Sequence, residues 1–499
     1  MAVVTRIAPS PTGDPHVGTA YIGLFNYVFA KQQGGKFILR IEDTDRERYS
    51  AESETRIMEM MHWLGLNPDE SVSAGGENGP YRQSERLAIY RDHAQQLLET
   101  GKLYASFTTA EELEALREEQ KRQGKSLGYD GRDRDIPLEE AKTRMAAGEA
   151  YVLRLRTPDE GDTVFHDVLR GEIRIPNHEI RDAVMMKSDG YPTYHFANVV
   201  DDHLMGVSHV IRAEEWITST PLHVLLYQAF GWELPQFVHM PLLRNPDKNK
   251  SKISKRKLDT SVDSYRQQGI LPEALRNFLA TMGWSMPNGR EFFSLEDMTE
   301  AFSLERISLG GPVFDLKKLR HFNAKYIREL LPLEDLAERL KPLLMQEQLP
   351  CNDEDYLLDV IDIMAPRAET LQDFIKQGHY FFTDNLSYDD KAKKVLSAGQ
   401  KYLEELELAF ARLDSFDVDS VDDMLHDYVQ SQAVPMGKVM QPLRVALTAT
   451  SNAPSVTDLV SVLGQQRVLQ RIAAALIAIT NSLPDDKPVK PEDAAHEAV

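Results

Sequence analysis

The spacing of apolar residues at the start of the chain predicts a strand, a loop, a helix and a second strand. Val3–Ile7 is short and mostly β-branched, as in a buried strand. Within Tyr21–Phe29, apolar side chains recur every three or four residues and share one helix face. Gly34–Gly35 would end that helix, and Phe37–Ile41 is strand-like again. The loop Pro9–Thr19 therefore follows the carboxyl end of the first strand, the edge where open parallel sheets bind ligands.

This loop and the helix after it predict an anion site. A helix N-terminus offers free backbone N–H groups and a partial positive charge to a phosphate. The loop is not a Walker loop, because no Gly-Lys-Ser/Thr follows four spacers. His16 can donate a hydrogen bond to a phosphate oxygen, and Gly18 lets a flat base lie against the backbone. A proline-rich turn without a ligand is the alternative that this stretch alone leaves open.

Residues 84–190 differ in character from the segments around them. Glu111–Lys125 is charge-rich and helical, Tyr151–Arg156 alternates like a strand, and Val164–Ile175 is also strand-like. We therefore expect an α+β insertion in a nucleotide-binding fold.

After residue 190 the sheet is expected to resume. Val207–Ile211 predicts a strand that ends at Arg212, and Val238–Leu243 predicts the last strand. Between them, Ser219–Pro221 predicts a helix start with a capping hydroxyl and proline in the first turn.

The remaining chain is predicted to be helical. Residues 251–325 are expected to form helices with glycine turns, and 326–482 amphipathic helices with short breaks. The segment 483–499 is Pro-rich and acidic without an apolar face, so we expect disorder. The pattern predicts an α/β multidomain protein, in which a doubly wound, Rossmann-type parallel sheet carries an α+β insertion and precedes all-α domains. A length of 499 residues fits several domains.

Composition adds a local charge contrast. The chain has a net charge of −21, yet residues 248–257 hold six basic residues and no acidic one. A solvated surface is one interpretation of such a run, and an anion site is the other. Cys351 is the single cysteine, which excludes an internal disulfide framework and a multi-cysteine zinc site. With no secretory pattern and no apolar run long enough to span a bilayer, we expect a cytoplasmic protein without a membrane partner.

Several motifs stand in order along the chain. HVGT occupies 16–19 and KISKR occupies 252–256. TRIAPSPTG lies at 5–13, RIEDTD at 40–45, GYPTYH at 190–195 and IRAEEW at 211–216. The first two resemble the His-Ile-Gly-His and Lys-Met-Ser-Lys-Ser signatures of class I aminoacyl-tRNA synthetases. With the others, the sequence from about residue 3 to about 482 resembles the bacterial glutamyl-tRNA synthetases.

The resemblance implies a reaction and its domains. The reaction is ATP-dependent attachment of L-glutamate to tRNA-Glu through glutamyl-adenylate, with Mg²⁺ that needs no cage made by protein alone. The domains would be a catalytic domain in two halves (1–83 and 191–250), an insertion for the tRNA acceptor end (84–190), a stem-contact domain with the KISKR loop (251–325), an anticodon-binding region (326–482) and a tail (483–499). The basic residues of the insertion could equally be ordinary surface charges.

The resemblance also assigns residues. The implied catalytic residues are His16, Lys252 and Lys255, although Lys252 could contact RNA phosphates only. The implied ATP-binding residues are Pro9, Ser10, Pro11, Thr12, Gly13, His16, Gly18, Thr19, Glu215 and Lys255. Thr19 stands where the family more often has a second histidine; its hydroxyl can donate one hydrogen bond but carries no charge.

Glutamate itself demands two cationic groups and one anionic group. Arg6, Arg212 and Glu42 lie at or just inside the carboxyl ends of predicted strands, and arginine suits a carboxylate. Glu42 would take the ammonium, and which arginine takes which carboxylate stays open. By resemblance, Ser10, Tyr194 and Asn198 line the same pocket. The alternative is a structural ion pair of Arg40 with an acid of 42–45.

The remaining assignments concern RNA and metal. Arg367 and Arg444 resemble positions that face anticodon bases, with a phosphate contact or a plain surface arginine as alternatives. Where some relatives carry a Cys-x-Cys zinc element, this chain has Ser106-Phe107-Thr108, so we expect no metal-binding residues. We expect a monomer. A short tRNA-modifying paralogue would lack anticodon-binding domains, so the helices predicted after residue 326 disfavour it. The motif at residues 8–13 and the all-helical C-terminal half disfavour a glutaminyl-tRNA synthetase. A noncatalytic RNA-binding protein is disfavoured by the intact motifs.

Overall fold

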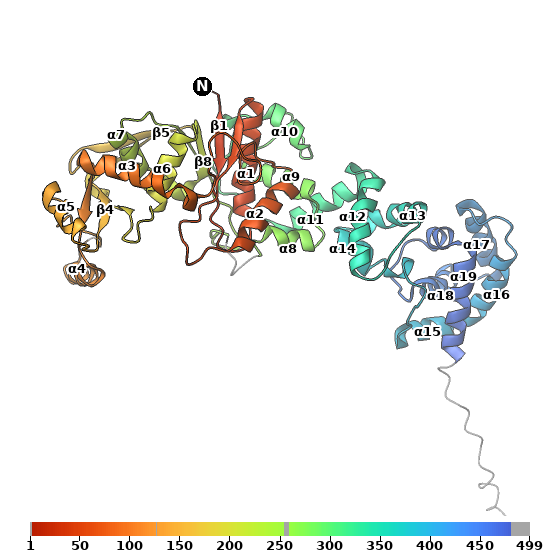
Figure 1. Cartoon of the computed structure of the whole chain (residues 1–499). Helices are drawn as coiled ribbons and strands as arrows, with labels where there is room; N and C mark the ends of the chain where they lie inside the picture. Colours follow the sequence, from red (N-terminus) through yellow and green to blue (C-terminus); the bar gives the residue numbers. More distant parts are fainter. Residues whose placement is uncertain (1, 126, 254–258, 481–499) are drawn as a thin grey trace, which may run out of the picture. The chain divides into compact units, whose positions relative to one another are not determined.

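The computed structural model describes residues 2–125, 127–253 and 259–480. The chain forms two compact units that divide between Phe322 and Asn323. Lys255 and the predicted tail 483–499 lie outside the described residues. Each unit is described by itself below (Figure 1).

The predicted strand–helix–strand start of the chain is confirmed. β1 (Val4–Ile7) runs parallel to β2 (Lys36–Leu39), and α1 (Val17–Gln32) connects them. Further along, β8 (His209–Ala213) and β9 (Gln236–Met240) are also parallel, and α6 (Tyr194–Leu204) and α7 (Thr220–Phe230) precede and connect them. The Ser208 N–H donates to the Val4 carbonyl, so β8 adjoins β1.

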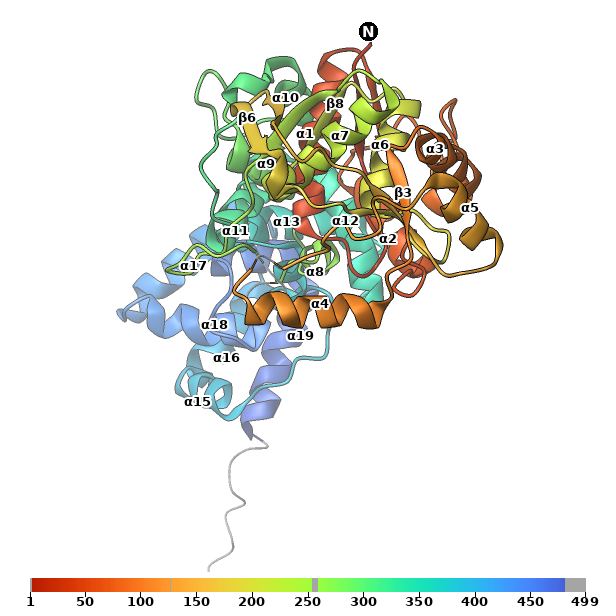
Figure 2. The same cartoon turned by 90° about the vertical axis from the view of Figure 1, so that its left-hand side faces the viewer.

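The insertion has a sheet of its own. β3 (Leu103–Ser106), β4 (Val152–Leu155) and β7 (Val184–Met186) pair antiparallel in that order. The helices of this part are α3 (Leu87–Glu99), α4 (Ala110–Arg122) and α5 (Leu138–Ala146). Figure 2 shows α4 set apart from α3 and α5. Only Gln120 of α4 is buried, as its charge-rich sequence suggests.

The strand character expected for Val164–Ile175 is confirmed, but the segment contains two strands and its place in the insertion differs from expectation. The segment forms a hairpin of β5 (Asp162–Asp167) and β6 (Gly171–Pro176), and β5 pairs with β9 rather than with the insertion sheet. The Asp167 carboxylate accepts from the N–H groups of Leu169 and Arg170 and so ends β5. The apolar alternation hid this turn, because side-chain pattern does not report backbone hydrogen bonds.

The expected hydroxyl cap of α7 is also wrong. Ser219 closes a 3₁₀ segment, η3 (Glu214–Ser219), with helical dihedrals, and its hydroxyl donates to the Trp216 carbonyl. The chain therefore enters α7 already helical and needs no cap there. Pro221 does occupy the first turn.

In the first unit, α2 (Ala51–Trp63), α9 (Pro272–Gly283) and α10 (Leu295–Ala301) share a core with α1. The unit also contains η1 (Gln83–Arg86), η2 (Asn177–Glu179), α8 (Val262–Gln267), η4 (Leu304–Arg306) and most of α11 (Leu316–Lys325). Phe25 of α1 meets Tyr21 and Phe302 edge to face, with ring centroids 5.3 and 5.8 Å apart. This shared core fixes α1, and with it the loop before it.

Within the described residues, the second unit contains helices and no strand. They are η5 (Tyr326–Leu330), α12 (Leu333–Gln346), α13 (Glu354–Met364), η6 (Ala365–Arg367), α14 (Leu371–Lys376), η7 (His379–Phe381), α15 (Asp390–Ala398), α16 (Gln400–Ala411), α17 (Val418–Gln432), α18 (Gly437–Thr448) and α19 (Val456–Thr480). Gly464, with φ of 76°, breaks α19. In the described part of the chain, no helix has the length and apolar character needed to cross a membrane. The predicted α/β class with an insertion and distal helices is confirmed.

Candidate active site

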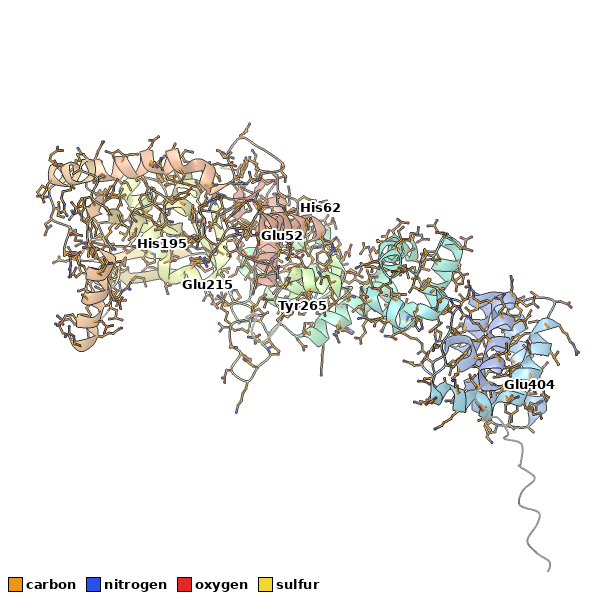
Figure 3. The ribbon with its side chains drawn as sticks, turned by 60° about the horizontal axis from the view of Figure 1, so that its bottom comes forward. Glu52, His62, His195, Glu215, Tyr265 and Glu404 are labelled. Carbon is orange, nitrogen blue, oxygen red and sulfur yellow. The ribbon has the colours of Figure 1, made fainter. Side chains whose placement is uncertain are left out.

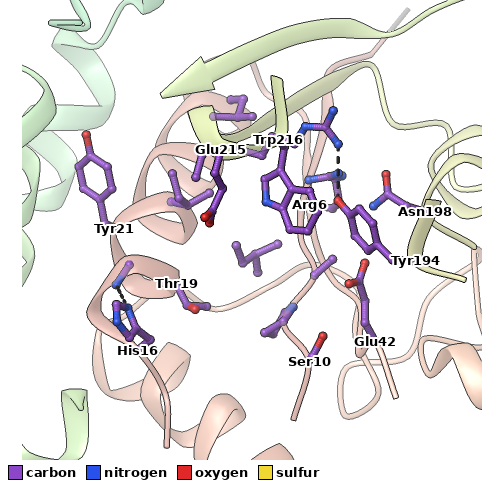
Figure 4. Close-up of a pocket in the computed structure, with 18 of the residues that line it drawn as sticks. Arg6, Ser10, His16, Thr19, Tyr21, Glu42, Tyr194, Asn198, Glu215 and Trp216 are labelled. Atoms are coloured by element: carbon purple, nitrogen blue, oxygen red, sulfur yellow. Dashed lines mark hydrogen bonds between the residues drawn. The ribbon is translucent and has the colours of Figure 1, made fainter. Parts of the chain in front are cut away.

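A cavity of about 710 Å³ lies at the carboxyl ends of β1 and β8 (Figure 4). That volume suits a small-molecule site. The predicted site residues that line it are Arg6, Pro9, Ser10, His16, Gly18, Thr19, Glu42, Tyr194, Asn198, Arg212, Glu215 and Lys252. Pro11, Thr12 and Gly13 are not among the described residues that line it.

The start of α1 differs from the expected anion site. Val17 N–H donates to the Thr260 carbonyl, Gly18 N–H to His16 Nδ1, and the N–H groups of Thr19 and Ala20 to the His16 carbonyl. All of these first-turn donors are thus used within the chain. The expectation of free N–H groups for a phosphate is wrong, because His16 caps its own helix.

The cap also orients the His16 ring. Nδ1 accepts from Gly18 N–H at 2.8 Å, so a neutral ring carries its proton on Nε2 and presents a donor there. A Cβ at residue 18 would lie 2.9 Å from Nδ1. Gly18 is therefore required for the ring to approach the helix. Because glycine has no side chain, the cavity wall at this position consists of backbone alone.

Arg6 is engaged by a carboxylate that sequence reasoning missed. Its Nε and Nη2 donate to Asp202 at 3.1–3.2 Å, and Arg40 Nη1 donates to the same carboxylate at 2.8 Å. Arg6 is thus not the free clamp that we expected. The signal was an acidic pair, Asp201–Asp202, directly after the apolar pair Val199–Val200, because an acid that is buried beside apolar residues demands cationic partners.

Arg40 does form buried ion pairs, as the alternative interpretation of this segment proposed, but its main partner lies outside residues 42–45. Its shortest ionic contact is with Asp202, and its distance to Glu42 is 3.8 Å. Asp43 instead pairs with Arg46 and accepts from Ser84. Glu42 therefore has Arg40 as an ion-pair partner at 3.8 Å, a distance too long for a hydrogen bond.

Glu42 is a buried carboxylate with spare capacity. It is 8% exposed, and its Oε1 is buried without a hydrogen-bond partner among the described residues. Burial raises the pKa of Glu42 to about 7 against the pull of Arg40 and Arg6. A cationic donor entering the cavity would satisfy this oxygen.

Arg212 is the complementary case. It is 4% exposed, and its contacts within the described residues are with uncharged groups, among them Tyr194 Oη at 3.5 Å. The Tyr194 ring stacks on Trp216 at 4.4 Å and forms the adjacent wall. Burial lowers the pKa of Arg212 from its ordinary value.

Lys252 and Glu215 form an ion pair at the rim of the cavity. Both side chains are partly exposed. Figure 3 shows Glu215 in the first unit, together with His195 of α6. Lys255, predicted beside Lys252, lies outside the described residues.

The segment Ser106–Thr108 is closed by a carboxylate. Asp133 Oδ2 accepts from the hydroxyls of Ser106 and Thr108 at 2.7 and 2.6 Å, and from the N–H groups of Phe107 and Thr108. No cluster of three metal-binding side chains occurs among the residues that were placed. The absence of zinc stays a prediction.

The two anticodon candidates lie together in the second unit. Arg367 is exposed and its Nη1 is 3.4 Å from Asn452 Oδ1. Burial and the charge of Arg367 lower the pKa of Arg444. The two positive charges are thus close enough to interact, in a chain whose net charge is −21.

Two family comparisons cover most of the sequence. Residues 2–321 match the family described as tRNA synthetases class I (E and Q), catalytic domain, and residues 335–476 match an anticodon binding domain. The chain is 53% identical to a glutamate–tRNA ligase of Thermus thermophilus over 474 residues, which cover 95% of this chain and 100% of that protein.

Other relatives agree. The glutamate–tRNA ligase of Deinococcus radiodurans is 53% identical over 477 residues, covering 95% of this chain and 98% of that protein. The crystal structure of a glutamate tRNA ligase from Elizabethkingia meningosepticum, in complex with its amino acid, has a TM-score of 0.86 at 37% identity and covers 96% of this chain and 100% of that one. The chain therefore belongs to the glutamate–tRNA ligases, within the class I tRNA synthetases.

Proposed function

We propose that this chain joins L-glutamate to the 3′ end of tRNA-Glu through a glutamyl-adenylate, with release of AMP and pyrophosphate. Family membership supports ligation of glutamate to tRNA. The observation that carries the substrate assignment is the pairing, in one cavity, of a buried arginine without a carboxylate partner and a buried glutamate with an unbonded oxygen, as far as the described residues extend.

An amino dicarboxylate fits these groups. Glu42 Oε1 accepts from the ammonium, and Arg212 takes one carboxylate as a bidentate partner. Arg6 contributes through Nη1, the nitrogen that makes no hydrogen bond to Asp202. Ser10, Tyr194 and Asn198 complete the lining.

The first chemical step brings two anions together. The α-carboxylate of glutamate attacks the α-phosphorus of ATP, so the protein must hold the reactants in line and supply donors where charge develops. His16 Nε2–H and the ammonium groups of Lys252 and Lys255 are the donors that we assign to the phosphates. Mg²⁺ would arrive with ATP and neutralise phosphate charge. Gly18 leaves room for the adenine.

The second step needs tRNA at both units. We assign the acceptor end to the insertion and the anticodon to Arg367 and Arg444, which offer planar groups for splayed bases. The overall negative charge limits adhesion to other RNA, so binding depends on these local sites.

Charging of purified tRNA with labelled glutamate tests the proposal. We expect ATP-dependent loading of tRNA-Glu, with tRNA-Gln assayed in parallel to define the acceptor range. Arg212→Gln should raise the apparent KM for glutamate more than about tenfold. A noncatalytic RNA-binding protein would instead retain tRNA without forming AMP, and that result would refute the proposal.

A further inference from the structure

Arg212 is held by uncharged acceptors that come from neighbouring elements. From β8 it donates Nε–H to His239 Nε2 on β9 at 3.1 Å and Nη1–H to His223 Nδ1 on α7 at 3.1 Å. Its Nη2–H donates to Thr220 Oγ1 at 2.8 Å. Arg6 and Arg40, by contrast, both have carboxylate partners in Asp202.

The direction of these hydrogen bonds fixes the histidine tautomers. A guanidinium only donates, so His239 Nε2 and His223 Nδ1 must be unprotonated. The proton of His239 therefore lies on Nδ1, which donates to Asp167 Oδ2 at 2.7 Å. The proton of His223 lies on Nε2, which donates to His195 Nδ1 at 3.1 Å. The tautomer of each ring is thus fixed by two partners, Arg212 on one nitrogen and Asp167 or His195 on the other.

The surroundings of the three rings also favour their neutral form. Burial lowers the pKa of His195 and His239, and burial beside Arg212 lowers the pKa of His223 well below its ordinary value. Asp167 is the carboxylate behind His239, separated from Arg212 by that ring. It is already satisfied by the N–H groups of His239, Leu169 and Arg170.

Neutral acceptors orient a guanidinium without cancelling its charge. An acidic side chain at the same distance would pair with Arg212 and compete with a substrate carboxylate. A neutral substrate would leave the buried cation uncompensated, which a site rejects strongly.

We infer that His223, His239 and Thr220 are positioning residues that keep the charge of Arg212 available, so that the substrate carboxylate becomes its ion-pair partner and glutamate is preferred over glutamine. This inference rests on the proposed function. It assigns amino-acid specificity to groups that need not touch the substrate.

The test is a pair of variants that differ only in charge. His223→Asn places an amide oxygen near the position of Nδ1 and keeps a neutral acceptor, whereas His223→Asp places a carboxylate there. In tRNA charging we expect the Asn variant to keep the KM for glutamate within about threefold. We expect the Asp variant to raise that KM roughly ten- to hundredfold, as for loss of a hydrogen-bonded charged partner.

Other readouts separate specificity from damage. The Asp variant should lower the ratio of kcat/KM for glutamate to that for glutamine, while the KM for ATP stays close to that of the parent. His209→Asp is the matched control, because His209 lies on the same strand and contacts Ser208 and Phe29 rather than Arg212. It should leave both amino-acid constants close to those of the parent.

The outcomes are distinct. Equal KM values in the Asn and Asp variants would overturn the inference. If Arg212→Gln leaves the KM for glutamate unchanged, the proposed function fails; if only the His223 pair is silent, the inference alone fails. Should the Asp variant not fold, His223→Leu replaces it: loss of the acceptor must raise the KM for glutamate about tenfold more than His223→Asn does, and equal values refute the inference.

Discussion

At the scale of single residues, the cavity holds two buried charged groups with spare hydrogen-bonding capacity, as far as the described residues extend. Arg6 and Arg40 share Asp202 and form a fixed ion-pair network, while Glu42 and Arg212 retain binding capacity toward the cavity. Burial makes that capacity costly in the free protein, because a desolvated charge is stabilised only by a ligand of opposite sign. Among the residues that we propose bind glutamate, Glu42 and Arg212 are therefore those with spare capacity, and Arg6 adds the nitrogen that Asp202 does not use.

Glu42 predicts a pH dependence. Its pKa of about 7 in the folded chain lies above the ordinary value of 4.5, and ammonium binding needs the ionised form. The kcat/KM for glutamate should therefore rise as pH increases through about 7. Glu42→Gln, which keeps the shape and removes the charge, should raise the KM for glutamate more than about tenfold and remove this rise. Steady-state charging across the pH range measures both.

Stability should change in the opposite sense. Between pH 4.5 and about 7 the folded state binds a proton at Glu42 that the unfolded state has lost, so the free energy of unfolding falls as pH rises through this window. Denaturant unfolding at both ends of the window should show that Glu42→Gln loses this part of the decline. An identical decline in the parent and the variant would contradict the assignment.

At the scale of elements, α1 depends on a side-chain cap. Gly18→Ala would bring a Cβ within 2.9 Å of His16 Nδ1, so the ring must move and the cap is lost. We expect a loss of ~0.5–2 kcal/mol in the free energy of unfolding, together with slower adenylate formation. Thermal unfolding and pyrophosphate exchange are the measurements.

Gly23→Ala is the control on the same helix. A Cβ there would lie 3.4 Å from the Met61 side chain and 3.9 Å from that of Ile7, which are ordinary contacts. Alanine has the better helix propensity, so stability should be equal or higher. If Gly18→Ala behaves like Gly23→Ala, the cap is not a determinant of α1.

In the insertion, the Asp133 carboxylate holds the segment Ser106–Thr108 by several hydrogen bonds. Although burial opposes it, hydrogen bonds from Thr108 and Ser106 lower the pKa of Asp133. Asp133→Asn should cost ~1–3 kcal/mol because charge-assisted hydrogen bonds are weakened. Asp135→Asn, at an exposed neighbouring position, should leave the free energy of unfolding unchanged.

The same segment predicts the metal content of the protein. Elemental analysis should find no stoichiometric zinc, because Ser106 and Thr108 stand where cysteine ligands would be needed. About one zinc per chain after chelation and dialysis would contradict this prediction.

At the scale of the whole molecule, the proposed function assigns a separate part of the task to each unit. The described cavity belongs to the first unit, and the arginine pair belongs to the second. Because the chain has a net charge of −21, we propose that RNA is selected through such local cationic sites.

Arg367 is the residue that tests this division. If it reads a base edge, Arg367→Ala should cost ~1–3 kcal/mol in kcat/KM with the correct anticodon, and less with a tRNA altered at the third anticodon base. The KM for glutamate and ATP should stay unchanged. Lys376→Ala, which removes another exposed cation of the same unit, should have little effect. A uniform loss across both tRNAs would identify a phosphate contact.

Patterns along the chain were enough to predict the strand–loop–helix start, the loop of residues 9–19, the helical second unit and the membership of the family. These features depend on neighbours in the chain, because periodicity, turn residues and motifs are local. Three-dimensional contacts were needed to show that Arg6 pairs with Asp202, which lies 196 residues further along the chain. They were also needed to show that Asp167 ends β5 and that uncharged groups accept the hydrogen bonds of Arg212. The physical reason is that pairing of buried charges depends on which side chains the fold brings together, and a residue's own type does not state its partner.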